Sequence, residues 1–318
     1  MHLAASSGGH TELLVAVREA VRDRELSWIL QPSPRAESLR EAGERVHLLP
    51  QWDRHPLRGH FVQNALRALA IVLRERPRLV VTTGAGITVP FCLFARLFGA
   101  RVIFLETMAR VTGPSASGRV LSRLARRTLV QWPETVSVYP RSRLCNPALL
   151  DVVPADPPNT GQGTFVAVGT HDQPFDRLLR MVDTAASAGL LPQPILVQAG
   201  VSEYRSESFA RADWLAPEEM EAEIRRAKFV VVHAGSGLVT TALRHGSRPL
   251  VLSRRAAFGE HFDDHQNQLT SKLADLGLVV KLGDEITAAD LRHAQQPLHA
   301  IDSGNVPTIS EALVRELT

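Results

Sequence analysis

Short apolar runs alternate with stretches of helical period through the first half of the chain. The runs that have the length and composition of buried strands are 26–31, 45–50, 79–83 and 102–106. The stretches that repeat apolar residues at helical spacing are 11–21, 61–74 and 89–98. Strands separated by helices of this length predict βαβ units and a parallel sheet.

The pattern stops at 151–163, where proline and glycine are frequent and no apolar period is visible. A second series follows, with expected strands at 165–168, 195–198, 229–233 and 249–253 and expected helices at 175–186, 218–226, 238–245 and 266–276. The sequence therefore predicts two doubly wound, Rossmann-like α/β domains, 1–152 and 164–318, joined by a linker at 153–163. Such domains usually bind a ligand in the cleft between them.

Composition narrows the class of protein. The chain has 318 residues, 44% of them hydrophobic and 22% charged, as in a soluble globular protein. A net charge of +3 is small for a nucleic-acid-binding protein, so we expect no nucleic-acid partner. Two cysteines provide neither a disulfide framework nor a thiolate zinc site. Because the N-terminus lacks the features of a signal peptide and no apolar stretch is long enough to span a bilayer, we expect a cytoplasmic protein.

The first candidate loop, Ser6 to Thr11, follows the first strand and opens the first helix. Its paired glycines, Gly8 and Gly9, let the backbone approach a ligand closely, and the helix start favours an anion or a polarised oxygen. His10 would then lie at the mouth of the cleft. The alternative is an ordinary tight turn with a solvated His10, and the loop alone does not decide between them.

The second candidate loop, His233 to Gly237, also lies between an apolar strand and a helix. Its small residues leave room for a diphosphate at the helix N-terminus, with Ser236 as an additional donor. The loop matches neither a Walker motif nor the full dinucleotide fingerprint. A close helix–strand crossing is the alternative, and we favour the phosphate site.

The third candidate loop runs from Arg254 to Gln268 and is rich in Glu, His, Asp and Gln. His261 and His265 have the i, i+4 spacing of metal ligands, but Phe262 stands where a zincin has glutamate. No third ligand is apparent, so we expect no metal. A polar loop that binds sugar hydroxyls fits the composition better.

These loops, with several further segments, resemble a known glycosyltransferase group. Part of the first half resembles the membrane-associated acceptor subunit of the dolichol-linked N-acetylglucosaminyltransferase. The segments that carry this resemblance are the loop Ser6–His10, Glu106-Thr-Met-Ala-Arg110-Val111, Gln131-Trp132-Pro133 and Tyr139-Pro140. Part of the second half resembles the donor-binding subunit of the same transferase. The segments that carry this resemblance are Phe165-Val-Ala-Val-Gly169-Thr170, 233–237 and Asp264-His265-Gln266. Both parts occur in bacterial exopolysaccharide glycosyltransferases and are similar to the halves of the peptidoglycan lipid II-forming enzyme. Here they would be fused, acceptor half first, over most of residues 1–280.

The resemblance implies the two-Rossmann (GT-B) fold and a UDP-sugar donor. It also implies an inverting transfer, without metal or cofactor, to a polyprenyl-diphosphate-linked saccharide in bacterial polysaccharide biosynthesis. The residues that we expect to bind the donor are Gly169, Thr170, His233, Gly235, Ser236, Gly237, Arg254, Arg255, Glu260, His261, Asp264, His265 and Gln266. The residues that we expect in the acceptor half are Gly8, Gly9, Thr11 and Arg110, with His10 and Glu106 as catalytic residues.

Two departures concern the donor. Thr241 stands where the eukaryotic donor subunit has an acidic residue, and the segment 253–261 is closer to bacterial glucuronosyltransferase-like members. We therefore expect UDP-glucuronate, with Arg254 and Arg255 pairing with its C6 carboxylate. The alternative is that both arginines are solvated or contact phosphate.

The expected mechanism follows from the transfer itself. The acceptor hydroxyl must lose a proton as it attacks the anomeric carbon, and a histidine such as His10 is the efficient base near neutral pH. Glu106 would orient His10 or act as the base itself; the alternative is a strand-end carboxylate paired with Arg110. The helix start at Ser236 would stabilise the leaving UDP. Two other functions stay open: a UDP-sugar epimerase of the same fold, and an inactive donor-binding assembly subunit.

A basic helix face is expected in the first half. Residues at i, i+4, i+7 and i+8 are Arg119, Arg123, Arg126 and Arg127, and apolar Val120, Leu121 and Leu124 lie beside them. This pattern predicts a peripheral protein that rests on the anionic inner face of the cell membrane. A solvated helix face is the alternative.

Overall fold

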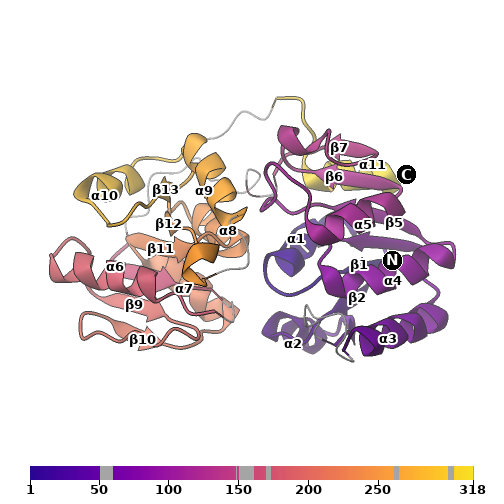
Figure 1. Ribbon diagram of the computed structural model, residues 1–318, viewed down its shortest axis with the longest axis horizontal. Coiled ribbons are helices and arrows are strands. Elements are labelled where there is room, and N and C mark those ends of the chain that lie inside the picture. Colours follow the sequence, from indigo (N-terminus) through magenta and orange to yellow (C-terminus); the bar gives the residue numbers. More distant parts are fainter. Residues whose placement is uncertain are drawn as a thin grey trace. The chain divides into compact units, whose positions relative to one another are not determined.

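The computed structural model describes residues 1–50, 60–147, 149, 161–169, 173–260, 265–299 and 304–317. The chain divides into two compact units, which are described one at a time: unit 1 is Met1–Ala148 with Ser303–Thr318, and unit 2 is Leu149–Asp302. Each unit is a parallel sheet with helices on both faces, so the predicted doubly wound architecture is confirmed for both (Figure 1).

The sheet of unit 1 has the order β3-β2-β1-β4-β5-β6-β7, and every neighbouring pair is parallel. Its strands are β1 (His2–Ala4), β2 (Ser27–Leu30), β3 (Arg45–Leu48), β4 (Leu79–Thr82), β5 (Arg101–Leu105), β6 (Arg127–Val130) and β7 (Ser142–Leu144). The strand order reverses between β1 and β4, which pair at His2 and Val80. In a doubly wound sheet this reversal marks the edge at which ligands bind.

Alternate side chains of these strands enter two separate cores. Leu3 and Val81 belong to the core covered by α1 (Gly9–Arg18), the short helix η1 (Glu19–Val21), α2 (Pro34–Glu41) and α11 (Ile309–Leu317). Ala4 and Val80 belong to the core covered by α3 (His60–Glu75), α4 (Val89–Leu97) and α5 (Ala116–Leu124). Because both faces are covered, the central strands β1, β4 and β5 carry apolar residues on both faces.

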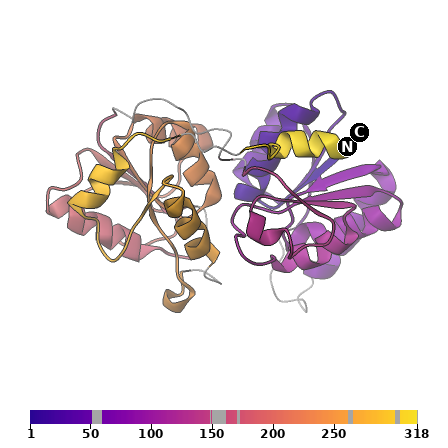
Figure 2. The same cartoon turned by 90° about the horizontal axis from the view of Figure 1, so that it is seen from above.

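Helix α11 corrects the predicted domain boundary. It lies beside β6 in unit 1, although 164–318 was expected to form the second domain (Figures 1 and 2). Ile309 and Leu313 are fully enclosed in the unit 1 core, and the backbone N–H of Asn146 donates to Pro307 O (2.8 Å). Its Glu316 pairs with both Arg127 (3.2 Å) and Arg143 (2.9 Å). An amphipathic helix carries no sequence signal for which of two sheets it covers, so the pattern alone placed it wrongly.

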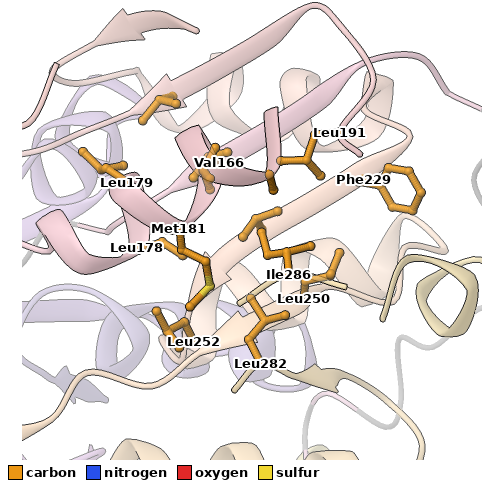
Figure 3. Close-up of a cluster of buried hydrophobic side chains, with 14 of the residues drawn as sticks. Val166, Leu178, Leu179, Met181, Leu191, Phe229, Leu250, Leu252, Leu282 and Ile286 are labelled. Atoms are coloured by element: carbon orange, nitrogen blue, oxygen red, sulfur yellow. The ribbon is translucent and has the colours of Figure 1, made fainter. Parts of the chain in front are cut away.

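The sheet of unit 2 has the order β10-β9-β8-β11-β12-β13 and is also parallel throughout. Its strands are β8 (Thr164–Ala167), β9 (Ile195–Gln198), β10 (Ala210–Ala212), β11 (Phe229–His233), β12 (Leu250–Leu252) and β13 (Val280–Lys281). Its helices are α6 (Asp176–Ser187), α7 (Pro217–Arg226), α8 (Ser236–Arg244), α9 (His265–Asp275) and α10 (Ala288–Ala294). Figure 3 shows the core in which Leu178 and Met181 of α6 approach Leu250 and Leu252 of β12. The order reverses between β8 and β11, as it does in unit 1.

Most predicted elements are present within a residue or two. The sequence pattern did not predict α2, β6, β7, β10, β13, α10 or α11. Residues 153–160 of the predicted linker lie outside the described residues, whereas Gln162 already joins unit 2 by donating its backbone N–H to Arg226 O (2.9 Å).

The four arginines predicted to form one basic helix face do not lie on a single helix. Helix α5 ends at Leu124, Ala125 is extended, and Arg127 is the first residue of β6. Of the four arginines, only Arg119 and Arg123 are therefore on the helix. Leu121, expected beside them at the surface, is fully buried.

Candidate functional site

The loop after β1 lies at the point where the strand order of unit 1 reverses. Gly8 has a positive φ (70°), a conformation that glycine adopts without strain, and it lets α1 begin at once at Gly9. His10 Nδ1 lies 2.8 Å from Thr83 O, directly after β4, and Thr83 Oγ1 donates to His10 O (3.0 Å). This pair joins the ends of the two strands that flank the reversal.

The bond to Thr83 selects the tautomer of His10. A carbonyl oxygen only accepts hydrogen bonds, so Nδ1 carries the proton and donates. In the neutral ring the lone pair is then on Nε2. His10 is half-buried, and its role as a general base stays a prediction.

The side chain of the neighbouring Thr11 is buried and supports the loop. Its side chain is 1% exposed, and Oγ1 donates back to Ser6 O, which fastens the loop onto the first turn of α1. Thr11 thus belongs to the predicted loop and supports it from the interior.

Glu106 is also enclosed. It follows β5, is 1% exposed, and accepts from Thr107 N (3.0 Å), from Ser115 Oγ (2.9 Å) and from the hydroxyl of Tyr139. Burial raises the pKa of Glu106, and the three partners oppose that rise. A Cβ at Gly118 would lie 2.8 Å from Glu106 Oε2, so only glycine allows α5 to approach this closely.

These contacts assign Glu106 a positioning role. Its carboxylate closes the loop from Thr107 to Ser115, on which half-buried Arg110 lies. The burial and the three partners of its oxygen atoms favour this positioning role over proton transfer, and the role of Glu106 as the base stays a prediction. Tyr139 and Ser115, which the sequence analysis did not single out as site residues, are its partners.

In unit 2 the loops after β8 and β11 meet at the strand reversal. The His233 ring lies between two glycines: a Cβ at Gly169 would be 2.2 Å from His233 Cε1, and one at Gly235 would be 2.2 Å from His233 Nε2. Gly169 also has a positive φ (81°) and is held by the buried Gln198, whose Oε1 accepts from Gly169 N (3.3 Å). Gly169, His233 and Gly235 are therefore brought together as predicted, and Gln198 is a partner that the sequence analysis missed.

Helix α8 begins on this loop. Gly235 is the extended N-cap, and Ser236, Gly237 and Leu238 in the first turn are half-exposed. The N–H groups of a first turn have no acceptor within the helix, and the helix dipole adds positive potential there. A Cβ at Gly237 would meet nothing within 4 Å, so the space in front of this turn is open. The arrangement suits the diphosphate of a nucleotide sugar.

The loop after β12 holds its arginines differently from the prediction. Arg254 is fully buried and donates to Val168 O (2.9 Å), Gln173 O (2.8 Å) and Glu260 O (3.1 Å). Its guanidinium stacks on Phe175 at 4.6 Å. Arg254 therefore ties together the segments after β8 and β12, and the prediction that it pairs with a sugar carboxylate is wrong.

Three neighbours of Arg254 complete this loop. Glu260 is 5% exposed and forms a two-pronged pair with Arg177, at 2.9 and 2.8 Å. Gln266 is buried, and its Oε1 accepts from Arg254 N (3.1 Å). Glu260 is thus a structural carboxylate instead of a sugar ligand, and Gln266 supports the loop backbone. Arg255 is exposed, beside Phe258.

Part of the predicted donor site falls outside the described residues. Thr170, His261 and Asp264 are not described, and of His265 only the backbone at the start of α9 is described. Their donor-binding roles stay predictions. Within the described ranges, no group of three or more His, Cys, Asp or Glu side chains is placed to hold a metal ion.

Known proteins resemble part of unit 1 in sequence and the whole chain in fold. The family model described as "Oligosaccharide biosynthesis protein Alg14 like" matches residues 59–147. This segment is Alg14-like. The mouse UDP-N-acetylglucosamine transferase subunit ALG14 is 37% identical over 78 residues, which are 23% of this chain and 36% of the subunit. The chain thus matches about a third of the length of that relative.

A longer match covers both units. The UDP-N-acetylglucosamine--N-acetylmuramyl-(pentapeptide) pyrophosphoryl-undecaprenol N-acetylglucosamine transferase of Xanthomonas oryzae is 28% identical over 94% of this chain and 71% of its own. The solved MurG of Acinetobacter baumannii has a TM-score of 0.62 at 16% identity, over 99% of this chain and 98% of that one. The UDP-GlcNAc 2-epimerase of Methanocaldococcus jannaschii has a TM-score of 0.66 at 11% identity, over 100% and 99%. The predicted GT-B fold is confirmed, and it is shared by transferases and epimerases.

Proposed function

We propose that this protein is a glycosyltransferase that moves N-acetylglucosamine from UDP-N-acetylglucosamine to a polyprenyl-diphosphate-linked saccharide. The observation that carries the proposal is the pair of loops at the strand reversals. One presents a base-oriented histidine, and the other presents the open first turn of α8 above the Gly169–His233–Gly235 cluster. The similarity of unit 1 to ALG14 and of the whole chain to the Xanthomonas transferase supports the same chemistry.

The donor now differs from the one expected from sequence. The expectation of UDP-glucuronate included Arg254 and Arg255 as partners of its carboxylate. Arg254 is fully buried, so only Arg255 is left in that role. The relatives named above carry UDP-N-acetylglucosamine or N-acetylglucosamine transfer in their names. UDP-N-acetylglucosamine is therefore the donor of choice for a first assay.

In the proposed mechanism, His10 Nε2 takes the proton of the acceptor hydroxyl as that oxygen attacks the anomeric carbon. Attack opposite the leaving UDP inverts the configuration. The charge that develops on the departing diphosphate is stabilised by the N–H groups and dipole at the start of α8, so the reaction needs no bound metal. Glu106 acts only by keeping the loop of Arg110 closed.

A UDP-release assay tests the proposal. The protein is mixed with UDP-N-acetylglucosamine, UDP-glucuronate, UDP-glucose or UDP-galactose, each with and without a polyprenyl-diphosphate-linked saccharide. We expect UDP release that requires the acceptor and is fastest with UDP-N-acetylglucosamine. Conversion of the free nucleotide sugar to its C2 epimer, read by proton NMR without acceptor, would show an epimerase. UDP binding with no turnover under any condition would show a donor-binding subunit.

We also propose that unit 1 rests on a membrane surface, through a face other than the one expected. Helices α3 and α4 pack side by side (Figure 1). Both helices also carry exposed apolar residues. The exposed set on these helices and the turn after α4 is Phe61, Val62, Leu66, Leu73, Leu93, Leu97 and Phe98, with Leu97 70% exposed. Exposed Arg67, Arg74 and Arg96 interrupt this surface. An apolar face interspersed with arginines suits the boundary between headgroups and acyl chains.

Vesicle co-sedimentation tests this face. Leu66→Ser with Leu97→Ser should reduce sedimentation with phosphatidylglycerol vesicles, whereas Val201→Ser with Val314→Ser, exposed apolar positions elsewhere, should not. Equal sedimentation of both double variants would contradict it. No helix among the described residues combines the length and the apolar character that crossing a bilayer requires.

A further inference from the structure

A cavity of about 260 Å³ in unit 1 is lined by five arginines. They are Arg96, Arg101, Arg123, Arg126 and Arg141, and the remaining lining residues are Ala100, Val102, Leu124 and Ala125. Arg96 and Arg123 are in the last turns of α4 and α5. Arg101 opens β5, Arg126 precedes β6, and Arg141 precedes β7. Segments that are distant in sequence thus bring their positive charges to one place.

The cavity contains no compensating negative side chain. Its lining includes no aspartate or glutamate, and within the part of the chain that the structure describes none of the five arginines forms an ion pair. Arginines elsewhere behave differently: Arg35 pairs with Glu12 (2.9 Å) and Arg177 with Glu260 (2.8 Å). Like charges gathered without counter-charges repel one another, so an arrangement of this kind favours an anionic ligand.

Ordinary helix capping accounts for only part of the cluster. The carbonyl ends of α4 and α5 carry partial negative charge, and Arg141 Nη2 donates to Arg123 O (2.9 Å) while Arg123 Nη1 donates to Arg119 O (2.6 Å). Two helix ends amount to about one negative charge in all. Arg96, Arg101 and Arg126 take no part in these two hydrogen bonds, so most of the positive charge is uncompensated.

We propose that this cavity binds a phosphate monoester or an equivalent dianionic phosphate group. Guanidinium groups present planar pairs of N–H donors that match phosphate oxygens, and five arginines line this one cavity. The volume equals that of roughly nine water molecules at about 30 Å³ each, which leaves room for a phosphate and part of what it is attached to.

The cavity is separate from the candidate site. It lies at the amino ends of β5 and β6, whereas Glu106 and the His10 loop follow the carboxyl ends of their strands. The proposal therefore does not depend on sugar transfer. Arg96 also belongs to the apolar face of α3 and α4, so the variants below leave Arg96 unchanged. A phosphate of a lipid headgroup and a free phosphate share the chemistry, and the experiment distinguishes them.

The test uses the full chain and two charge-matched double variants. Arg101→Gln with Arg126→Gln removes two lining charges from exposed positions, and Arg40→Gln with Arg292→Gln removes two exposed arginines elsewhere. Each protein is titrated with inorganic phosphate by calorimetry. It is also sedimented with phosphatidylcholine vesicles that contain or lack phosphatidic acid. Circular dichroism melts check that the variants are folded.

We expect the cavity variant to lose affinity by about tenfold or more and the control variant to keep it, because each charged hydrogen bond contributes on the order of 1.5–3 kcal/mol. Loss of phosphate binding identifies a site for free phosphate. Loss confined to phosphatidic acid vesicles identifies a headgroup site. If neither probe distinguishes the cavity variant from the control, or if neither probe binds the wild-type protein, the proposal is wrong.

Discussion

His10 donates from Nδ1 to the carbonyl oxygen of Thr83 at 2.8 Å and accepts the Thr83 hydroxyl on its own carbonyl oxygen at 3.0 Å. The two residues follow β1 and β4, the strands between which the order of the sheet reverses. This double link fixes the orientation of the imidazole on its loop, with Nδ1 directed at the carbonyl oxygen of Thr83.

His10→Ala should lower kcat by roughly 10²–10⁴-fold, the usual contribution of a positioned base. The Kd for UDP should hardly change, because the donor loops belong to unit 2. Steady-state UDP release and calorimetry measure the two quantities. His299→Ala, at an exposed position of unit 2, is the matched control. A His10→Ala protein with full kcat would exclude His10 as the base.

Gly169→Ala and Gly235→Ala should each weaken UDP binding strongly, because the new Cβ would lie 2.2 Å from the His233 ring and push the loop apart. Gly283→Ala, where a Cβ would meet nothing within 4 Å, should leave binding unchanged. Calorimetric titration with UDP gives the Kd of all three proteins. Unchanged affinity in both loop variants would show that the cluster does not shape the donor site.

Arg254→Met should destabilise unit 2 by about 3 kcal/mol or more, because it leaves three carbonyl acceptors in the interior without their donor. Arg255→Met changes an exposed side chain, and we expect a change within about 0.5 kcal/mol. Urea unfolding followed by circular dichroism measures both. Similar stabilities of the two variants would argue against the structural role assigned to Arg254.

Acid should destabilise unit 1 through His2. Burial lowers the pKa of His2 to about 4, with a further contribution from the N-terminal ammonium that outweighs the opposing effect of Glu75. The unfolded chain therefore binds a proton more readily, and the free energy of unfolding should fall as the pH drops from about 6.5 towards 4. The slope from His2 is at most about 1.4 kcal/mol per pH unit.

Urea unfolding at several pH values measures this slope. His2→Gln should flatten it, and His293→Gln, at an exposed position on α10, should not. The neighbouring His47, whose pKa is also lowered chiefly by burial, should leave a residual slope. An identical pH profile for His2→Gln and the unmodified protein would contradict the prediction.

The sequence pattern determined the two sheets and the location of the candidate loops. Apolar runs of strand length separated by helices permit little other than parallel βαβ units. In such units every loop that follows a strand lies at the same edge of the sheet. For that reason the residues around His10 and around His233 were assigned to ligand-binding loops before any side chain was placed.

The direction in which each polar side chain points was decided only by the tertiary structure. Glu106, Glu260 and Arg254 all stand next to strand ends and had the appearance of ligands. They are buried because Tyr139, Arg177 and the carbonyl of Val168, at distant positions in the chain, supply their partners. The same holds for α11, whose apolar stripe suits either sheet. Local pattern reports the period and length of an element, whereas the pairing of buried charges and the choice of sheet depend on contacts between segments that are far apart in sequence.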